Sequence, residues 1–231
     1  MEKSLYELLN RVDTPTVCNA IEVAQGQRGF ANFTRQTMQF AGNGKKVMVG
    51  FAKTAQIAAV EPPKEDADTI RARRMDYYRY MADVNGPAVT VIEDTDFPNC
   101  IGAYWGEINT TVHKGFGISG VVTNSVMRDL DDMAPDFPVL AGSIGPSHGF
   151  VHVKSFDKEV SICGMTVQPG DLLHADQHGA VNIPKDVVPN LENAINQLLE
   201  NEHIVLGPAR EEGFDFDAFE KAWAAFEKAR A

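Results

Sequence analysis

The chain of 231 residues predicts an α/β fold, and three features of the sequence support this class. Residues 44–123 alternate apolar stretches suited to buried strands with helical stretches of crossover length. Short strands separated by turns follow, and two helical stretches end the chain. No internal repeat or low-complexity tract interrupts this order, so we expect a single domain over residues 1–231.

Two short helices are expected at the N-terminus, within about residues 4–26. Four apolar residues recur at helical spacing in the first of them, namely Leu5, Leu8, Leu9 and Val12. Thr14 and Pro15 have the residue types of an N-cap and a first helical position, and Gly26 is suited to end the second helix.

The middle of the chain supplies the alternating elements. Residues 44–60 combine apolar and small side chains without a helical stripe, which favours strands buried on both faces. We expect helices at residues 65–82 and 102–114, and strands at residues 87–92 and 118–123.

The second half is expected to form a β-rich lobe closed by C-terminal helices within residues 187–231. Its short strands are predicted at residues 151–153, 160–162, 165–167 and 172–174. The turn at Pro169, Gly170 and Asp171 is the clearest of those that separate them.

Composition excludes several classes of function. Acidic residues outnumber basic residues by 32 to 21, and the resulting net charge of −11 repels nucleic acid and anionic membranes. Three widely spaced cysteines without a CxxC motif favour reduced thiols over a disulfide framework or zinc ribbon. Without a membrane-length apolar run or a signal-peptide pattern, the sequence predicts a cytoplasmic protein.

The residues that point to chemistry lie between Gly106 and Asp132. Glu107 opens a predicted helix, and Arg128 and Asp129 follow a predicted buried strand. Helix N-termini and the carboxyl ends of strands meet at the ligand-binding edge of an α/β sheet. Two carboxylates favour a hard cation there, while helix N–H groups favour an anion.

Glu107, the twenty residues after it, and the pair Arg128 and Asp129 form a pattern that resembles the RraA-like family. This family includes the class II 4-hydroxy-4-methyl-2-oxoglutarate aldolases. Segments 86–91, 105–107 and 169–176 are also similar to family segments, and the resemblance covers about residues 14–185. It implies the layered, swivelling β/β/α fold of that family, and assembly as a homotrimer or homohexamer.

The same resemblance implies a divalent-metal-dependent carbon–carbon lyase, an aldolase or oxaloacetate decarboxylase. It would release pyruvate from a 2-oxo acid through a metal-stabilised enolate. Asp129 would bind Mg²⁺ or Mn²⁺ directly, and Glu107 would hold the ion through water. Arg128 would face the keto oxygen, and the backbone N–H groups of Ile108 and Asn109 would bind the substrate carboxylate.

Two positions depart from the family pattern. Glu107 stands where the family usually has Asp, which changes the reach of the carboxylate toward the metal. Asn124 and Ser125 replace a usual Asp-Gly pair, and the serine restricts close approach of a ligand and adds a hydroxyl. The first departure can alter the metal geometry, and the second leaves the identity of the substrate open.

Other interpretations remain open. The same family contains regulators that bind a ribonuclease, so a non-catalytic binding protein is the main alternative. Taken singly, Glu107 and Asp129 could be helix-start acids and Arg128 a surface ion pair. A methyltransferase is not expected, because no glycine-rich loop follows a first strand.

Three further patterns have competing interpretations. His174 and His178 have the spacing of a zinc pair on a helix, but the turn residues around them favour a strand and turn. Ser147 and His148 are adjacent, which in an extended chain turns the two side chains apart and disfavours a hydrolase pair. A C-terminal aromatic stripe could cover the chain's own core or a neighbouring subunit; it comprises Phe216, Phe219, Trp223 and Phe226.

Overall fold

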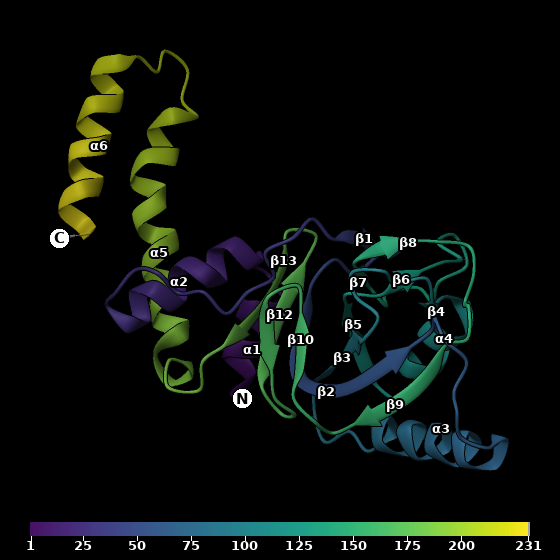
Figure 1. Ribbon diagram of the computed structural model, residues 1–231. Helices are drawn as coiled ribbons and strands as arrows, with labels where there is room; N and C mark the ends of the chain where they lie inside the picture. The colour runs from purple at the N-terminus through teal and green to yellow at the C-terminus, as the bar shows by residue number, and fades with distance from the viewer. Residues whose placement is uncertain (231) are drawn as a thin grey trace.

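The computed structural model describes residues 1–230, and its centre is a curled mixed β-sheet flanked by helices (Figure 1). The strand order is β1-β7-β5-β3-β2-β12-β13, and β9 pairs with β2 outside this path. The strands are β1 (Gln39–Ala41), β2 (Met48–Ala58), β3 (Ala88–Asp94), β5 (Ile118–Thr123), β7 (Val139–Ala141), β9 (His152–Phe156), β12 (Leu172–Asp176) and β13 (Gly179–Ile183). The α/β prediction is confirmed.

The second half of the chain is rich in short strands at the predicted positions, but β9 and β12 do not form a lobe of their own, because both join the main sheet. The long strand β2 pairs in parallel with β3 along one edge. Its other edge pairs with two later strands, β12 and β9. β12 pairs with the first half of β2, where Leu172 lies opposite Phe51, and β9 pairs with the last part of β2, where His152 lies opposite Ala58. Pairing between strands so distant in sequence is not encoded in the local pattern of either strand.

A second, three-stranded parallel sheet lies beside the main sheet. It consists of β4 (Ala103–Trp105), β6 (Val126–Met127) and β8 (Ser143–Ile144). The prediction of one helix over residues 102–114 is therefore wrong at its start, because Ala103 and Trp105 are buried on a strand. Helix α4 (Glu107–Gly115) begins directly after it, at the residue predicted to open the helix.

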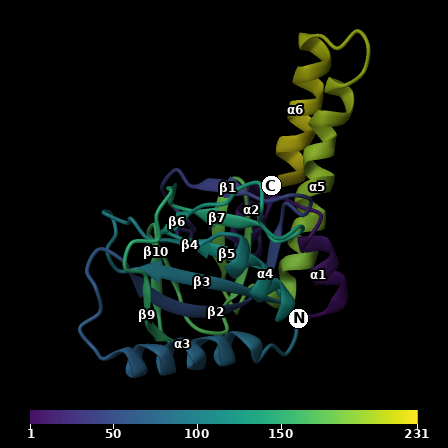
Figure 2. The ribbon, with the colours of Figure 1, turned by 90° about the vertical axis from the view of Figure 1, so that its right-hand side faces the viewer.

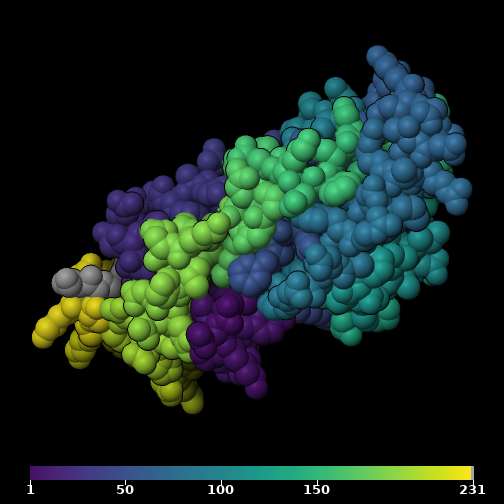
Figure 3. Space-filling model, turned by 90° about the horizontal axis from the view of Figure 1, so that it is seen from below, coloured from purple at the N-terminus to yellow at the C-terminus, as the bar shows by residue number. Residues whose placement is uncertain are grey.

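Besides α4, the helices are α1 (Lys3–Leu9), α2 (Thr14–Gln25), α3 (Ala67–Ala82), α5 (Val188–Ala209) and α6 (Phe216–Arg230). The space-filling view from below shows α1, in purple, and α5, in yellow-green, toward one end of the molecule and α3, in blue, toward the other (Figure 3). The N-cap of α2 is Asp13, whose carboxylate accepts a hydrogen bond of 2.9 Å from the Thr16 amide. The prediction of Thr14 as the cap is wrong by one residue, because Asp13 is the better acceptor.

Three groups of buried apolar side chains form the core. One joins α1, α2 and α5 to β12 and β13, and includes Leu9, Ile21 and Leu191. A second lies between α3, the small sheet and β5, and includes Tyr77 and Trp105. The third lies beneath the hairpin of β10 (Val160–Ile162) and β11 (Met165–Val167).

The end of α5 and all of α6 form a helical hairpin that extends away from the rest of the protein (Figures 1 and 2). Among the described side chains of α6 only Ala222 is buried, whereas Phe216 is 71% exposed and Trp223 is 42% exposed. Helix α6 lies along α5, and the three core groups include none of the four aromatic side chains of the stripe. In residues 1–230 no helix has both the length and the apolar character needed to cross a membrane.

Candidate active site

The small parallel sheet brings the predicted acidic and basic residues together. Gly106 and Glu107 directly follow β4, and Arg128 and Asp129 directly follow β6. The Glu107 amide lies 3.4 Å from Asp129 Oδ2, and Arg128 Nε lies 3.4 Å from the same oxygen. The strand ends and the helix start therefore meet at one edge, as the sequence predicts.

Backbone geometry is specialised where these residues meet. Asp129 has a left-handed backbone with φ of 53°, which is uncommon for a residue other than glycine. At Gly106, an added Cβ would lie well inside contact distance of Asp129 Oδ2. The Asp129 carboxylate therefore approaches the start of α4 because residue 106 has no side chain.

Arg128 and Asp129 leave polar groups unused. Their side chains are 34% and 37% exposed, and Glu107 is exposed as well. Within residues 1–230, the buried Nε of Arg128 forms no hydrogen bond, because its contact with Asp129 has ion-pair distance but not hydrogen-bond geometry. Buried polar groups are normally paired, so this atom marks a place where a ligand can complete the arrangement.

The first turn of α4 directs backbone N–H groups toward the end of the helix at which Asp129 lies. Its N-cap residue, Gly106, provides no side-chain hydrogen bond, so the amide groups at the helix start have no side-chain partner from it. The backbone amides of Ile108 and Asn109 belong to this turn, as predicted. The Asn109 side chain is used elsewhere, because Nδ2 donates to the Tyr104 carbonyl at 2.6 Å and Oδ1 accepts from Tyr78 at 2.9 Å.

The buried residue His113 of α4 connects this helix to Tyr77 of α3. His113 Nδ1 lies 2.7 Å from the Asn109 carbonyl, which can only accept, so Nδ1 carries the proton and Nε2 accepts from the Tyr77 hydroxyl at 2.7 Å. Burial lowers the pKa of His113 to about 4, so the ring is neutral at pH 7. This role of His113 was not predicted, and its neighbours Thr111 and Lys114 give no sequence signal that the ring is buried.

Exposed apolar side chains surround the three site residues. Ile108 is 70% exposed, Ile144 is 52% exposed at the end of β8, and Leu130 is 37% exposed after Asp129. Apolar groups at the rim of a polar site reduce the water around it when a ligand or a protein covers them.

The alternative sites have structural explanations. Ser147 Oγ accepts from the Gly149 amide and His148 Nδ1 lies 2.8 Å from the Gly149 carbonyl, so the two side chains do not form a nucleophile and base pair. His174 and His178 lie on a strand and the following turn, as predicted. Among the described residues no group of three or more His, Cys, Asp or Glu could hold a metal ion.

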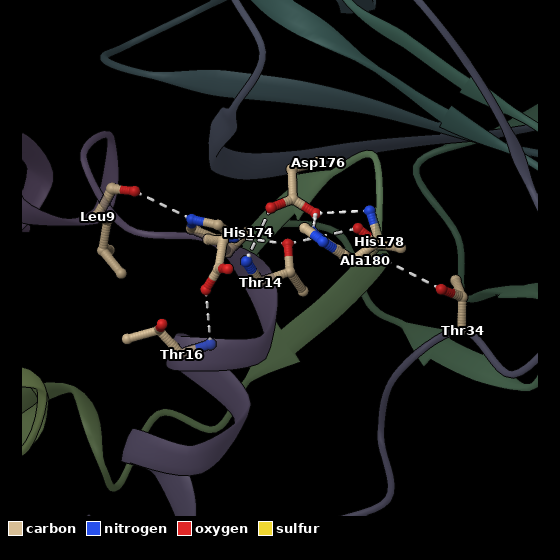
Figure 4. A network of polar contacts seen from close by, with 10 residues as sticks. Leu9, Thr14, Thr16, Thr34, His174, Asp176, His178 and Ala180 are labelled. Atoms are coloured by element: carbon tan, nitrogen blue, oxygen red, sulfur yellow. Dashed lines mark hydrogen bonds and ion pairs between the residues drawn. The ribbon is translucent and has the colours of Figure 1, made fainter. Parts of the chain in front are cut away.

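His174 instead belongs to a buried clasp that joins α2 to β12 and β13 (Figure 4). Its Nε2 donates to the Leu9 carbonyl at 2.9 Å, and Nδ1 lies 3.0 Å from the Thr14 hydroxyl. Asp176 accepts from the amides of Thr14 at 2.9 Å and His178 at 2.8 Å, so it organises the turn after β12. Burial lowers the pKa of His174 and keeps the ring neutral.

Ser125 is fully buried, and its hydroxyl, which has a single proton, lies 2.8 Å from Asp94 Oδ2 and 3.0 Å from the Gly102 carbonyl. Both acceptors belong to the protein, so the hydroxyl has partners within the described residues. The effect of Ser125 on the substrate stays a prediction. Its partners lie 23 and 31 residues away in sequence, so local patterns could not reveal them.

The fold and the site together define an α/β protein that has two acidic residues and an arginine just after the ends of short parallel strands. A family model described as RraA-like, Aldolase/RraA, matches residues 14–182. The chain therefore belongs to the Aldolase/RraA family, and the resemblance stated from the sequence is confirmed.

Individual proteins similar to this chain agree with the family. Uncharacterized protein MJ0644 of Methanocaldococcus jannaschii is 36% identical over 97 residues, which cover 41% of this chain and 47% of that protein. This chain thus matches about half the length of that relative.

Two solved structures share the fold. An uncharacterized protein from Pseudomonas syringae pv. tomato str. DC3000 has a TM-score of 0.70 at 22% identity, covering 97% of this chain and 95% of that one. Streptomyces coelicolor RraAS2, described as an unusual member of the RNase ES inhibitor RraA protein family, has a TM-score of 0.66 at 21% identity, covering 91% and 98%. At these identities the two structures establish the fold and not an activity.

Proposed function

We propose that this protein is a divalent-metal-dependent lyase that cleaves a carbon–carbon bond of a 2-oxo acid and releases pyruvate. One observation carries the proposal: Glu107, Arg128 and Asp129 come together at the start of α4, where Gly106 provides no side-chain cap and, within residues 1–230, the buried Nε of Arg128 has no hydrogen-bond partner. A site of this composition offers binding to a cation and to an anion side by side.

The donor set fits Mg²⁺ or Mn²⁺. Asp129 and Glu107 are carboxylates, and hard cations of this kind bind few carboxylates and retain several waters. Gly106 leaves room beside Asp129 Oδ2 that any larger residue would fill. When bound, such a cation supplies Lewis-acid polarisation of a keto oxygen.

The chain's own residues would hold and polarise the substrate. Arg128 has a fixed backbone, because its amide donates to the Trp105 carbonyl at 2.8 Å, and its guanidinium can face a keto oxygen or a carboxylate. The N–H groups of Ile108 and Asn109 suit the carboxylate of a 2-oxo acid. These groups would favour the charge that develops as the bond breaks.

The chemistry requires negative charge on the pyruvyl unit. In retro-aldol cleavage the aldol hydroxyl loses its proton and becomes a carbonyl, while the electrons of the broken bond pass to the pyruvyl unit as an enolate. Protonation of that enolate gives pyruvate. Decarboxylation of oxaloacetate forms the same enolate with loss of carbon dioxide, so one site can support both reactions.

A direct assay tests the proposal. The purified protein would be incubated with a panel of 2-oxo acid aldols and oxaloacetate, with Mg²⁺ or Mn²⁺, and pyruvate release would be followed by a coupled assay. We expect release above the metal-only background, and its loss on adding EDTA. The absence of metal-dependent release from every compound would contradict the lyase proposal.

A second candidate function is a regulatory protein that binds a ribonuclease without catalysis. The exposed side chains of Ile108, Leu130 and Ile144 favour it, because they suit contact with a macromolecule. Inhibition of a purified ribonuclease of the E type, retained in the Asp129→Ala variant, would support binding. Inhibition absent at micromolar protein would leave the lyase as the better candidate.

We also propose that the chain assembles as a homotrimer or homohexamer. The hairpin of α5 and α6 supports this, because it exposes Phe216 and Trp223 and, among the described side chains of α6, buries only Ala222. A helical hairpin with so little buried surface gains stability from a further contact. Light scattering at micromolar concentration should give a mass of three or six chains, and a monomer mass would contradict the assembly.

A further inference from the structure

Asp94, Asn124 and Ser125 form a buried hydrogen-bonded cluster, the polar joint, next to the strands that carry the candidate active site. Asp94 ends β3, is 1% exposed, and its carboxylate accepts from the Ser125 hydroxyl at 2.8 Å and from the Asp96 amide at 3.0 Å. The pKa of the Cys100 thiol is raised to about 12, mainly by burial and also by the nearby charge of Asp94. The carboxylate is thus enclosed by groups that hold it in one position.

Asn124 fixes the same joint through its side-chain amide. Oδ1 accepts from the Asp94 amide at 2.7 Å, and Nδ2 donates to the Asp94 carbonyl at 3.2 Å. The amide group therefore pairs with both backbone groups of Asp94. An aspartate at residue 124 could accept the first bond but could not donate the second.

Ser125 connects this joint to both strands that carry the site. Its hydroxyl reaches the carbonyl of Gly102, which directly precedes β4, and Ser125 itself directly precedes β6. The two strands pair in parallel, with Ala103 opposite Val126 and Trp105 opposite Met127. Glu107 lies just beyond β4, and Asp129 lies just beyond β6.

Only the short strands β4 and β6 separate the polar joint from the site residues, so a displacement of the joint also displaces those residues. β4 has three residues and β6 has two, so the joint lies on the order of 10 Å from the site at about 3.3 Å per residue. The far ends of the strands are held by the hydrogen bond between the Arg128 amide and the Trp105 carbonyl. A shift at Ser125 therefore changes how Arg128 and Asp129 face Glu107.

We propose that Asn124 and Ser125, anchored on Asp94, are positioning residues that set the distance between Glu107 and the pair of Arg128 and Asp129. This inference rests on the proposed function, since it assigns these residues to the metal site of the lyase. They touch neither metal nor substrate, and they act through the two short strands.

The test compares two hydroxyl deletions. Ser125→Ala removes the hydroxyl at the joint, and Ser155→Ala is the matched control, because Ser155 Oγ donates to Gln56 Oε1 at 2.8 Å away from the site on the pair of β2 and β9. Three quantities would be measured on the full chain: the thermal midpoint, the affinity for Mn²⁺ without substrate, and amide hydrogen exchange of residues 124–130 relative to β12. Ser125→Gly provides a second variant.

We expect Ser125→Ala and Ser125→Gly to lower Mn²⁺ affinity about 10-fold or more, as for other residues that orient metal ligands. Exchange in residues 124–130 should accelerate by a similar factor, and Ser155→Ala should change neither quantity. Mn²⁺ affinity unchanged within about twofold in both Ser125 variants, even with a lowered thermal midpoint, would overturn the proposal.

The measurement separates this inference from the proposed function. If the wild-type protein binds Mn²⁺ but releases no pyruvate, the lyase proposal fails while the affinities still decide the role of Ser125. If the wild-type protein binds no Mn²⁺, the metal-dependent function fails. The hydrogen exchange of the Ser125 variants then decides whether Ser125 positions residues 124–130. Unchanged exchange in residues 124–130 would then overturn the joint as a positioning device.

Discussion

Two polar clusters in this protein are each built around an aspartate at the end of a β-strand, and they differ in how many of their groups are satisfied. In the clasp, the buried carboxylate of Asp176 accepts two amide hydrogen bonds, and both ring nitrogens of His174 have partners. In the candidate active site, Asp129 is partly exposed and Arg128 Nε has no hydrogen bond within residues 1–230.

The difference indicates what each cluster can do. A saturated buried network stabilises one arrangement and has nothing left to offer a ligand. A cluster with unused donors and acceptors at a helix start retains them for a ligand, and its residues add little to stability. Substitutions in the two clusters should therefore separate activity from stability.

The largest effect is expected for Asp129→Ala. This change removes the carboxylate that approaches the start of α4, which is the direct metal ligand of the proposed site. We expect nearly all metal-dependent pyruvate release to be lost, with a thermal midpoint close to that of the wild type. Substantial activity at saturating Mg²⁺ or Mn²⁺ would show that Asp129 is not a ligand.

Arg128→Lys should reduce kcat about 100-fold, as the loss of an oxyanion donor does. Lysine keeps the charge but not the planar fork that can hold a keto oxygen and a carboxylate together. Steady-state kinetics of pyruvate release would check this. A change confined to KM would instead mean that Arg128 only binds the substrate.

Substitutions of Glu107 should have graded effects. If Glu107 acts through water, Glu107→Asp keeps measurable activity, because a shorter carboxylate still accepts a hydrogen bond from a displaced water. Glu107→Gln removes the charge and should cost about 10- to 100-fold in metal affinity. Mn²⁺ titration of each variant should rank them Glu, Asp, Gln, Ala, and an unchanged Glu107→Ala would leave Glu107 as a helix-start acid.

The smallest effect on activity is expected at the clasp. His174→Phe removes two buried hydrogen bonds and leaves the Leu9 carbonyl without its donor, which should cost about 2–4 kcal/mol of unfolding free energy. Activity per folded molecule should stay within about twofold, because the clasp has no unused groups to offer a ligand. Urea unfolding measures the unfolding free energy, and the pyruvate assay measures the activity. A loss of activity without a loss of stability would contradict the difference between the clasp and the candidate active site.

The same variant has a defined dependence on pH. Burial lowers the pKa of His174 in the folded protein, so the unfolded chain takes up a proton first as the pH falls. The stabilisation is complete above the unfolded pKa of about 6.5 and is lost as the pH falls below it toward the folded value. The wild type should therefore lose stability more steeply than His174→Phe on going from pH 7 to pH 5.

Much of the site could be predicted from sequence because its residues match a family pattern of fixed spacing and follow predicted strands and a predicted helix start. Glu107, Arg128 and Asp129 follow apolar stretches with a recognisable strand or helix pattern, and their spacing matches a family. The alternation of strands and helices likewise indicated the α/β class, because it depends on periodicities of two and 3.6 residues.

The tertiary structure alone decided how distant segments meet. It assigned β12 and β9 to the same sheet as β2, made residues 103–105 a strand, and joined Ser125 to Asp94 and Gly102. These outcomes depend on which strand edges and buried polar groups find partners across long separations in the chain. A local pattern specifies that a strand or a donor exists, whereas its partner is chosen by the packing of the whole fold.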